Sequence, residues 1–352
     1  MKIRGKGHHS PLPTPHYPPT RLLLELLHII SGQFLPRALS PTNRVDWPLF
    51  QELVRRHRLS ALFHRELPDD TPLPSPVRDK WEEEYHRQLA RTVLEQDCLS
   101  RILEAFTRSG IKSIVLKGPH LAQEYYPHPA LRPSDDIDLL IQPEDQIPAG
   151  KIIRKMGFSI VEESATAEKF SQADTGIFLE VHTGLQTPDR RNPSFEIKIE
   201  DFWRSSLPAQ IADQPTRVLS PTINLLYLAA HLSHHGFSRI IWFYDLYLVI
   251  KKSGDSLNWD ELIEKTHRYR CVGQVYYSLL HTGYFFGKTA PNEVLKELAP
   301  GPIKRQTTLF FITPGAILNR QIADSGWKAL RNRFLINDDW ILAFKKYFSS
   351  RG

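Results

Sequence analysis

The sequence predicts an α+β protein, with a small mixed β-sheet packed by helices and helical regions on either side. Apolar residues recur at helical spacing before residue 110 and after residue 221, whereas the stretch between them alternates strand and helix patterns. With 352 residues, 41% of them hydrophobic and 24% charged, the chain resembles ordinary globular proteins and can bury more than one structural unit.

Four regions follow from this pattern. The first is basic and rich in proline and histidine, which predicts disorder, and the apolar segment after it contains Glu25 and His28. A basic start before an apolar run can imitate a signal peptide, but these polar residues favour an amphipathic helix. The expected regions are a tail at 1–20, an N-terminal helical region at 21–110, a catalytic core at 111–207 and a C-terminal helical region at 208–352.

The core begins with a strand that ends in a glycine turn. An apolar run precedes Lys117-Gly118, and Pro119 then suits the first turn of a short helix that extends to about Tyr126. Free backbone N–H groups at a helix start attract anions, and a glycine lets the backbone approach a phosphate closely. The turn therefore predicts a phosphate-binding element.

A second strand carries two acids. In the run from Arg132 to Ile141, Asp136, Asp138 and Leu140 share one face, and the apolar residues between them share the other. Adjacent carboxylates repel each other unless a cation lies between them, and Mg²⁺ prefers such oxygen ligands. An acidic doublet after Pro-Ser can instead be only a capped turn. The apolar alternation beyond the acids and the upstream Lys-Gly turn favour the metal site.

A later strand at 177–182 supplies a third acid. Its alternation places Glu180 and His182 on one face, opposite its apolar residues. If the two acidic strands are neighbours, Glu180 joins Asp136 and Asp138. Three such carboxylates can hold two metal ions about 3.5–4 Å apart, an arrangement used in nucleotidyl transfer.

These motifs resemble the DNA polymerase beta-like nucleotidyltransferase superfamily, and more narrowly its group of uncharacterised bacterial nucleotidyltransferases. The superfamily shows a glycine turn before a helix, alternating acids on a strand and a third acid on a later strand. The likeness extends from about Asp46 to near Pro291. The segments that carry it are 46–59, Leu116-Lys117-Gly118, Leu131-Arg132-Pro133, Asp136-Ile137-Asp138-Leu139-Leu140, Leu179-Glu180-Val181-His182, His231–Phe237 and Trp242–Asp245.

The resemblance implies Mg²⁺-dependent transfer of a nucleoside monophosphate from an NTP to an unknown acceptor, a small molecule or a macromolecule. It implies that the three acids are catalytic and hold the metal ions. The NTP is expected to contact Lys117, Gly118, Arg132, Ser134 and His182. Pro119 departs from the usual Gly-Ser or Gly-Gly turn, which leaves the phosphate contact open. A toxin-like enzyme acting on tRNA or protein, or a degenerate nucleotide-binding module, remains an alternative.

Charge and cysteine content set broad limits. The formal net charge of +6 gathers partly at the chain ends, so nucleic acid binding is possible but not required. Cys98 and Cys271 are too few for a disulfide framework or a zinc site, which favours a cytoplasmic location. No apolar stretch is long enough to cross a membrane. The sequence does not indicate an oligomeric state.

A histidine-rich helix follows the core. His231, His234 and His235 share a helical face, but a catalytic glutamate does not accompany them as in helical zinc motifs. A substrate contact or packing at a cleft edge is the better interpretation. Trp242 and Asp245, one turn apart on the next helix, fit either a core role or a substrate-facing one.

Overall fold

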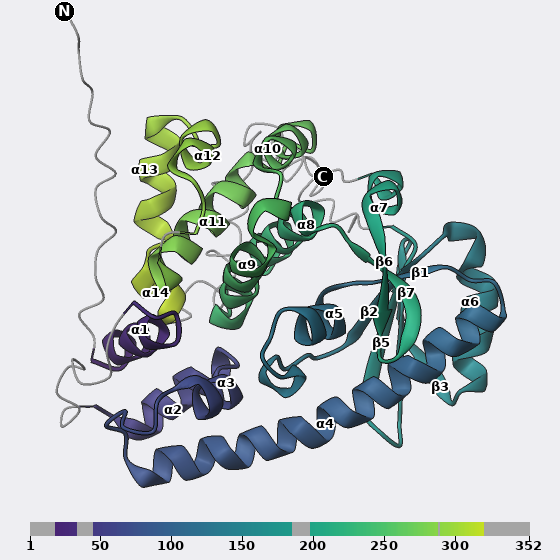
Figure 1. The fold of residues 1–352 in the computed structure, drawn as a ribbon, viewed down its shortest axis with the longest axis horizontal. Helices are drawn as coiled ribbons and strands as arrows, with labels where there is room; N and C mark the ends of the chain where they lie inside the picture. Colours follow the sequence, from purple (N-terminus) through teal and green to yellow (C-terminus); the bar gives the residue numbers. More distant parts are fainter. Residues whose placement is uncertain (1–17, 34–44, 185–197, 288, 320–352) are drawn as a thin grey trace, which may run out of the picture.

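The computed structural model describes residues 18–33, 45–184, 198–287 and 289–319, and it confirms the α+β class. Figure 1 shows a sheet on one side of the molecule and a group of helices on the other, joined along one side by a long helix. This helix, α4 (Ser75–Arg108), accounts for much of the helical apolar spacing upstream of the core.

In the described part of the chain, the strands form one mixed sheet in the order β3-β4-β5-β2-β1-β7-β6. β1 pairs antiparallel with β2 and parallel with β7, while β2 and β5 are parallel. The strands are β1 (Ser113–Val115), β2 (Ile137–Ile141), β3 (Phe158–Glu163), β4 (Ala167–Gln172), β5 (Ile177–His182), β6 (Ser206–Ile211) and β7 (Gln214–Leu219).

The sequence predicted β1, β2 and β5 from their residues and β3 only as part of the alternating strand and helix pattern, whereas β4, β6 and β7 were not predicted. The β6–β7 hairpin joins the sheet through β1. The core boundary expected at 207/208 therefore falls inside β6, and the sheet continues to Leu219.

One face of the sheet is closed by helices. The C-terminal half of α4 buries Leu99, Ile102 and Phe106, at spacings of three and four, against Leu139 of β2 and Leu179 of β5. Helix α6 (Gln146–Lys155) covers the same face. At about 25 cal/mol per Å² of apolar area removed from water, such burial fixes which face of β2 points inward. The acidic residues of β2 must then point to the opposite face.

That opposite face meets α5 (Lys117–Glu124) and the helical half of the molecule (Figure 1). Leu140 of β2 belongs to the large core that these helices share. The other helices are α1 (Pro18–Ile30), α2 (Trp47–Arg56), α3 (Ser60–Glu66), α7 (Ile199–Ser205), α8 (Pro221–His234), α9 (Ile240–Ser253), α10 (Trp259–Arg268), α11 (Val272–Phe286), α12 (Asn292–Glu297), α13 (Pro302–Phe311) and α14 (Pro314–Leu318), with short 3₁₀ turns at Pro129–Leu131, Pro143–Asp145 and Gly254–Ser256.

The N- and C-terminal helices pack as one unit. The buried His57 lies between them: its Nε2 atom is 2.7 Å from the Leu318 carbonyl, and its Nδ1 atom accepts from the Ile240 N–H at 3.2 Å. Both ring nitrogens are therefore satisfied, which buried polar groups require. Of the regions expected from sequence, residues 1–17 of the tail lie outside the described residues, and Pro18–Thr20 belong to α1.

Candidate active site

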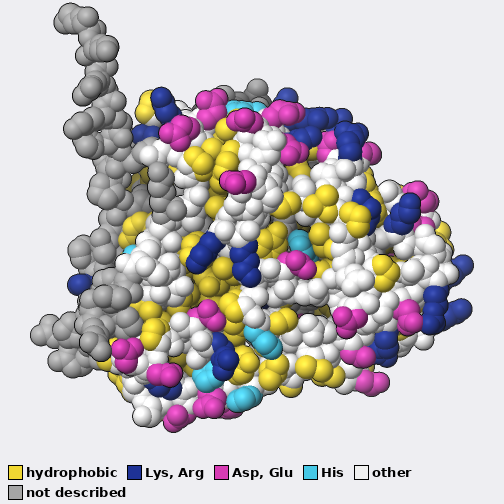
Figure 2. Space-filling model, viewed as in Figure 1, with side chains coloured by type: hydrophobic (Ala, Val, Ile, Leu, Met, Phe, Trp, Pro, Cys, Tyr) yellow, Lys and Arg dark blue, Asp and Glu magenta, His cyan; other side chains and the backbone are white. Residues whose placement is uncertain are grey.

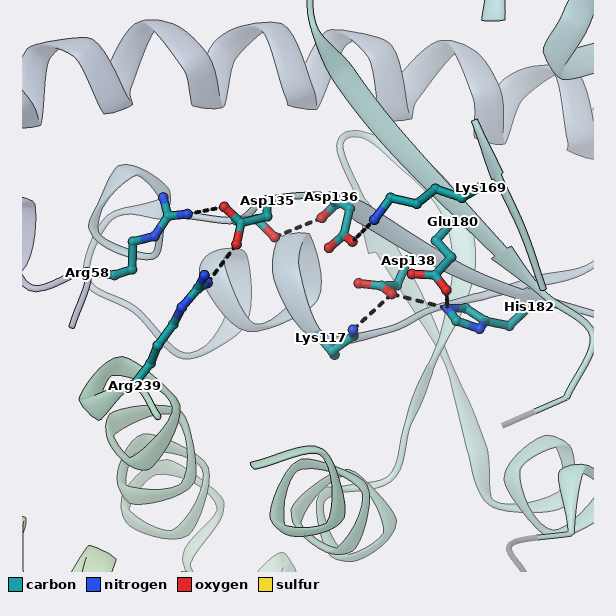
Figure 3. Close-up of polar contacts among 10 residues, drawn as sticks. Arg58, Lys117, Asp135, Asp136, Asp138, Lys169, Glu180, His182 and Arg239 are labelled. Carbon is teal, nitrogen blue, oxygen red and sulfur yellow. Dashed lines mark hydrogen bonds and ion pairs between the residues drawn. The ribbon is translucent and has the colours of Figure 1, made fainter. Parts of the chain in front are cut away.

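The strand register brings the acids of β2 and β5 side by side. In the parallel β2–β5 pair, Asp138 lies opposite Glu180 and Leu140 lies opposite His182. On the other side of β5, Lys169 of β4 is the antiparallel partner of Glu180. One row across three strands therefore presents Asp138, Glu180 and Lys169 on the same face, as Figure 3 shows.

Asp138 is the centre of the site. Its carboxylate is only 1% exposed, and its Oδ1 atom lies 2.9 Å from Lys117 Nζ and 3.2 Å from His182 Nε2 (Figure 3). Burial alone would raise the pKa of Asp138, but the Lys117 charge and the His182 hydrogen bond outweigh burial and lower this pKa to about 2. Burial would likewise lower the pKa of Lys117, whereas the Asp138 charge raises it. Both groups are therefore charged at neutral pH.

Asp138, Glu180 and His182 together form a set of metal-ligand atoms. One ligand atom from each residue lies within 4.8 Å of the others, and the His182 Nε2 to Glu180 Oε1 distance is 3.8 Å. Burial raises the pKa of Glu180, so its carboxylate gains from a nearby cation. The two carboxylates offer the oxygen ligands that Mg²⁺ prefers, and the His182 imidazole can orient both of them. The residues present thus fit the metal that the sequence predicts.

Asp136 lies beside this set rather than in it. Its Oδ2 atom is 3.2 Å from Lys169 Nζ, so two of the three expected acids pair with different lysines, Asp136 with Lys169 and Asp138 with Lys117. Burial and the Asp138 charge raise the pKa of Asp136, while Lys117 and Lys169 act against them. Its predicted role as a metal ligand stays a prediction. Lys169 was not predicted as a site residue. Its position beside Glu180 depends on the pairing of β4 with β5, and β4 was not predicted.

The Lys117-Gly118 turn packs closely against the segment that precedes β2. A Cβ atom on Gly118 would lie 2.8 Å from Ser134 Oγ and 3.4 Å from the Asp136 carbonyl, so a larger residue would displace Ser134. The Ser134 hydroxyl donates to that same carbonyl at 2.8 Å. Lys117 has a φ of 30°, in the left-handed region that costs non-glycine residues free energy. The turn thus holds the lysine against Asp138 at the expense of backbone strain.

Arg132 pairs with a buried carboxylate. Its guanidinium donates to both carboxylate oxygens of Asp245, at 3.0 and 2.9 Å, and both side chains are buried. The Tyr126 hydroxyl also donates to Asp245, at 2.8 Å. The expected phosphate contact of Arg132 stays a prediction, and it would require the guanidinium to leave the buried Asp245 carboxylate. Asp245, which the sequence analysis left between a core and a substrate role, is its structural partner.

A third polar group lies at the edge of the site. Asp135 binds Arg58 from the α2–α3 turn and Arg239, whose Nη1 atom is 2.6 Å from Asp135 Oδ2 (Figure 3). Burial would raise the pKa of Asp135, but the two arginines lower it. The Arg239 guanidinium also lies 5.0 Å from the centre of the Trp242 ring. These contacts tie both helical regions to the turn before β2.

The family model for uncharacterised nucleotidyltransferases matches residues 43–287, which is more than half of the chain. The chain belongs to this family. It is therefore a nucleotidyltransferase, as its motifs predict, and the match covers every candidate site residue described above. No curated protein matches the chain.

Solved structures similar to this nucleotidyltransferase match about half of it. A crystal structure of ANT(2'')-Ia in complex with adenylyl-2''-tobramycin is 15% identical, with a TM-score of 0.39, and covers 50% of this chain and 97% of that one. An antigenic nucleotidyltransferase-like protein from Paracoccidioides brasiliensis is 15% identical, with a TM-score of 0.38, and covers 57% of this chain and 96% of that one. Among the described residues, the helices are each too short or too polar to span a membrane.

Proposed function

We propose that this nucleotidyltransferase moves a nucleoside monophosphate from an NTP to an acceptor hydroxyl, with Mg²⁺ held by Asp138 and Glu180. The observation that carries the proposal is the group of Asp138, Glu180 and His182 beside the Lys117-Gly118 turn. Metal ligands and a phosphate-binding turn are the two elements that phosphoryl chemistry requires next to each other. Asp136, two residues before Asp138 on the same face, is the further carboxylate available to a second ion.

When bound, Mg²⁺ would neutralise the charge of the triphosphate and of the departing pyrophosphate. The protein residues have separate tasks. Lys117 would move its ammonium contact from Asp138 to a phosphate oxygen. The backbone N–H groups at the start of α5 would donate hydrogen bonds to another phosphate oxygen. His182 contacts Asp138 and Glu180 and keeps both carboxylates oriented.

The reaction itself is a displacement at the α-phosphorus. The acceptor oxygen forms a bond to this phosphorus, and the bond from phosphorus to the oxygen that bridges to the β-phosphate breaks, so pyrophosphate leaves. The acceptor proton would pass to the Glu180 carboxylate, whose pKa is raised by burial toward the range useful to a base. Positioning and charge neutralisation provide most of the rate enhancement in such reactions.

The test is transfer of label from α-³²P NTPs into a cell extract by the purified protein, with and without Mg²⁺. We expect a labelled product and released pyrophosphate that require the metal, and Asp138→Asn should lower the rate by at least about 1000-fold. Asp174→Asn is the control, because Asp174 is an exposed acid in the β4–β5 turn. Undiminished transfer by Asp138→Asn would refute the assignment. The size and nuclease sensitivity of the product would separate a small acceptor from tRNA or protein.

A further inference from the structure

Four aromatic side chains gather where α8 ends and α9 begins. Tyr227, His231 and His235 follow one another at spacings of four along α8, with ring centres 6.5 and 4.5 Å apart. Trp242 of α9 lies 5.1 Å from both imidazoles. We call these four residues the ring cluster. His231 and Trp242 are half-buried and His235 is exposed, so the cluster keeps ring surface open to a ligand.

The ring cluster lies near the acidic site. The charges of Lys117, Asp138 and Glu180 all act on the Tyr227 hydroxyl, whose pKa burial raises well above its ordinary value. Beyond burial, Lys117 also lowers the pKa of His231. Helix α8 lies on the side of the sheet to which β2 turns Leu140 and Asp138 (Figure 1). Figure 2 shows histidine and acidic side chains together near the centre of the visible face.

The charge around the ring cluster decides which ligand fits. His235 keeps an accessible edge, but the protein atoms packed around it remove part of its hydration, and this desolvation together with the charges of His234, Lys117 and Arg239 lowers its pKa to about 3. The imidazoles are thus neutral at physiological pH, and the cations around them disfavour a positively charged ligand such as a polyamine. Neutral rings beside an arginine and a lysine instead suit a planar base attached to an anionic chain.

A metal site and a purely structural role explain the ring cluster less well. The sequence disfavoured a zinc site, and among the described residues the metal-ligand set is Asp138, Glu180 and His182, which does not include the three histidines at the end of α8. Residues that only pack the core are buried, as Phe237 and Phe243 are close by. His235 is exposed, which suits a contact with a ligand better than packing in the core.

We propose that the ring cluster is the nucleobase subsite: it stacks the base of the NTP while the triphosphate lies between Lys117 and the acids. This assignment rests on the proposed nucleotidyl transfer and adds the place where the nucleotide is recognised. Because stacking on neutral rings tolerates every base, we expect affinities for ATP, GTP, CTP and UTP to differ modestly, with the larger purines bound more tightly.

The experiment is calorimetric titration with Mg²⁺ and either ATP or inorganic tripolyphosphate, which has the same phosphates but no base. The variants are His235→Ala, Trp242→Leu and Trp242→Phe, each checked for an unchanged melting temperature. His86→Ala is the control: it removes an exposed histidine of α4, whose ring contacts Tyr85 and Glu82 and not the ring cluster. Trp242→Phe keeps a ring, and therefore tests stacking even if Trp242→Leu fails to fold.

We expect His235→Ala and Trp242→Leu to weaken ATP binding about 5- to 100-fold and to leave tripolyphosphate binding unchanged. Trp242→Phe and His86→Ala should bind ATP within about threefold of the wild type. Unchanged ATP binding by both ring-removing variants, or an equal loss for ATP and tripolyphosphate, would overturn the subsite while nucleotidyl transfer stands. A wild-type protein that binds neither ligand would overturn the proposed function and the subsite together.

Discussion

Replacing Lys117 by methionine tests the central ion pair of the site. Methionine keeps the length of the side chain but removes the ammonium group that lies 2.9 Å from Asp138 Oδ1. The Asp138 carboxylate would then be buried with His182 as its remaining close partner among the described residues. Because a buried, poorly paired charge is costly, we expect the metal-free variant to be less stable than the wild type at neutral pH.

The size of this loss in the free energy of unfolding follows from two arguments. Lys117 and His182 together lower the pKa of Asp138 from 3.8 to about 2 in spite of burial, and at 1.36 kcal/mol per pKa unit this net gain is on the order of 2 kcal/mol. Removing one partner of a buried ion pair costs about 3–5 kcal/mol in other proteins. We therefore expect Lys117→Met to lower the free energy of unfolding by about 2–5 kcal/mol at pH 7.

The assay is urea unfolding at pH 7 in EDTA, followed by a double-mutant cycle. Asp138→Asn combined with Lys117→Met should recover much of the loss, because the double variant leaves no unpaired charge. Adding Mg²⁺ should stabilise Lys117→Met more than the wild type, since the metal no longer competes with the ammonium for Asp138. A loss below about 1 kcal/mol, or a double variant no more stable than the single one, would refute the reasoning.

The remaining predictions concern the turn, the buried arginine and pH. Gly118→Ala should lower the transfer rate by about 10- to 100-fold, because its Cβ would meet Ser134 Oγ at 2.8 Å, and adding Ser134→Ala should restore part of the rate. Arg132→Met should lower the free energy of unfolding by about 3–5 kcal/mol in urea, whereas Arg132→Met with Asp245→Asn should be less damaging if the pair is structural. Burial raises the pKa of Glu180, so protons compete with the metal, and the rise in melting temperature caused by Mg²⁺ should shrink from pH 7.5 to pH 5. A Mg²⁺ effect independent of pH would exclude this titration.

Local periodicity was sufficient to predict the parts of the site that lie within single elements. Alternation along β2 and β5 put Asp138 and Glu180 on like faces, and the structure confirms that the two strands are neighbours in register. Glycine before proline predicted a turn and a helix start at Gly118, which α5 confirms. These features are visible in sequence because each depends on residues within a few positions of one another.

Features that depend on distant pairing were not predictable in the same way. Lys169 and the β6–β7 hairpin come from strands whose apolar alternation is weak, since the residues of β4 are mostly half-exposed. The pair between Arg132 and Asp245 joins residues 113 positions apart, and the phosphate contact expected of Arg132 stays a prediction. A single sequence contains no signal for that pairing beyond the two residue types.

The balance of charge in the site leads to a last prediction about the order of binding. Asp136, Asp138 and Glu180 contribute three negative charges, and Lys117 and Lys169 offset two of them, at 2.9 and 3.2 Å. One net negative charge attracts free Mg²⁺ weakly, because the metal must displace an ammonium from its carboxylate. A triphosphate supplies new partners for Lys117 and brings ligands for the metal.

Metal and nucleotide should therefore bind with positive coupling. Titration of Mg²⁺ into the wild type with a non-hydrolysable α,β-methylene NTP should give an affinity at least about tenfold higher than without the analogue, and linkage requires the same factor for the analogue when Mg²⁺ is present. Lys117→Met should reduce this factor, because its carboxylate is already available to the metal. Equal coupling in the variant and the wild type would show that Lys117 does not compete with the metal, and that the ion pair with Asp138 persists through the reaction.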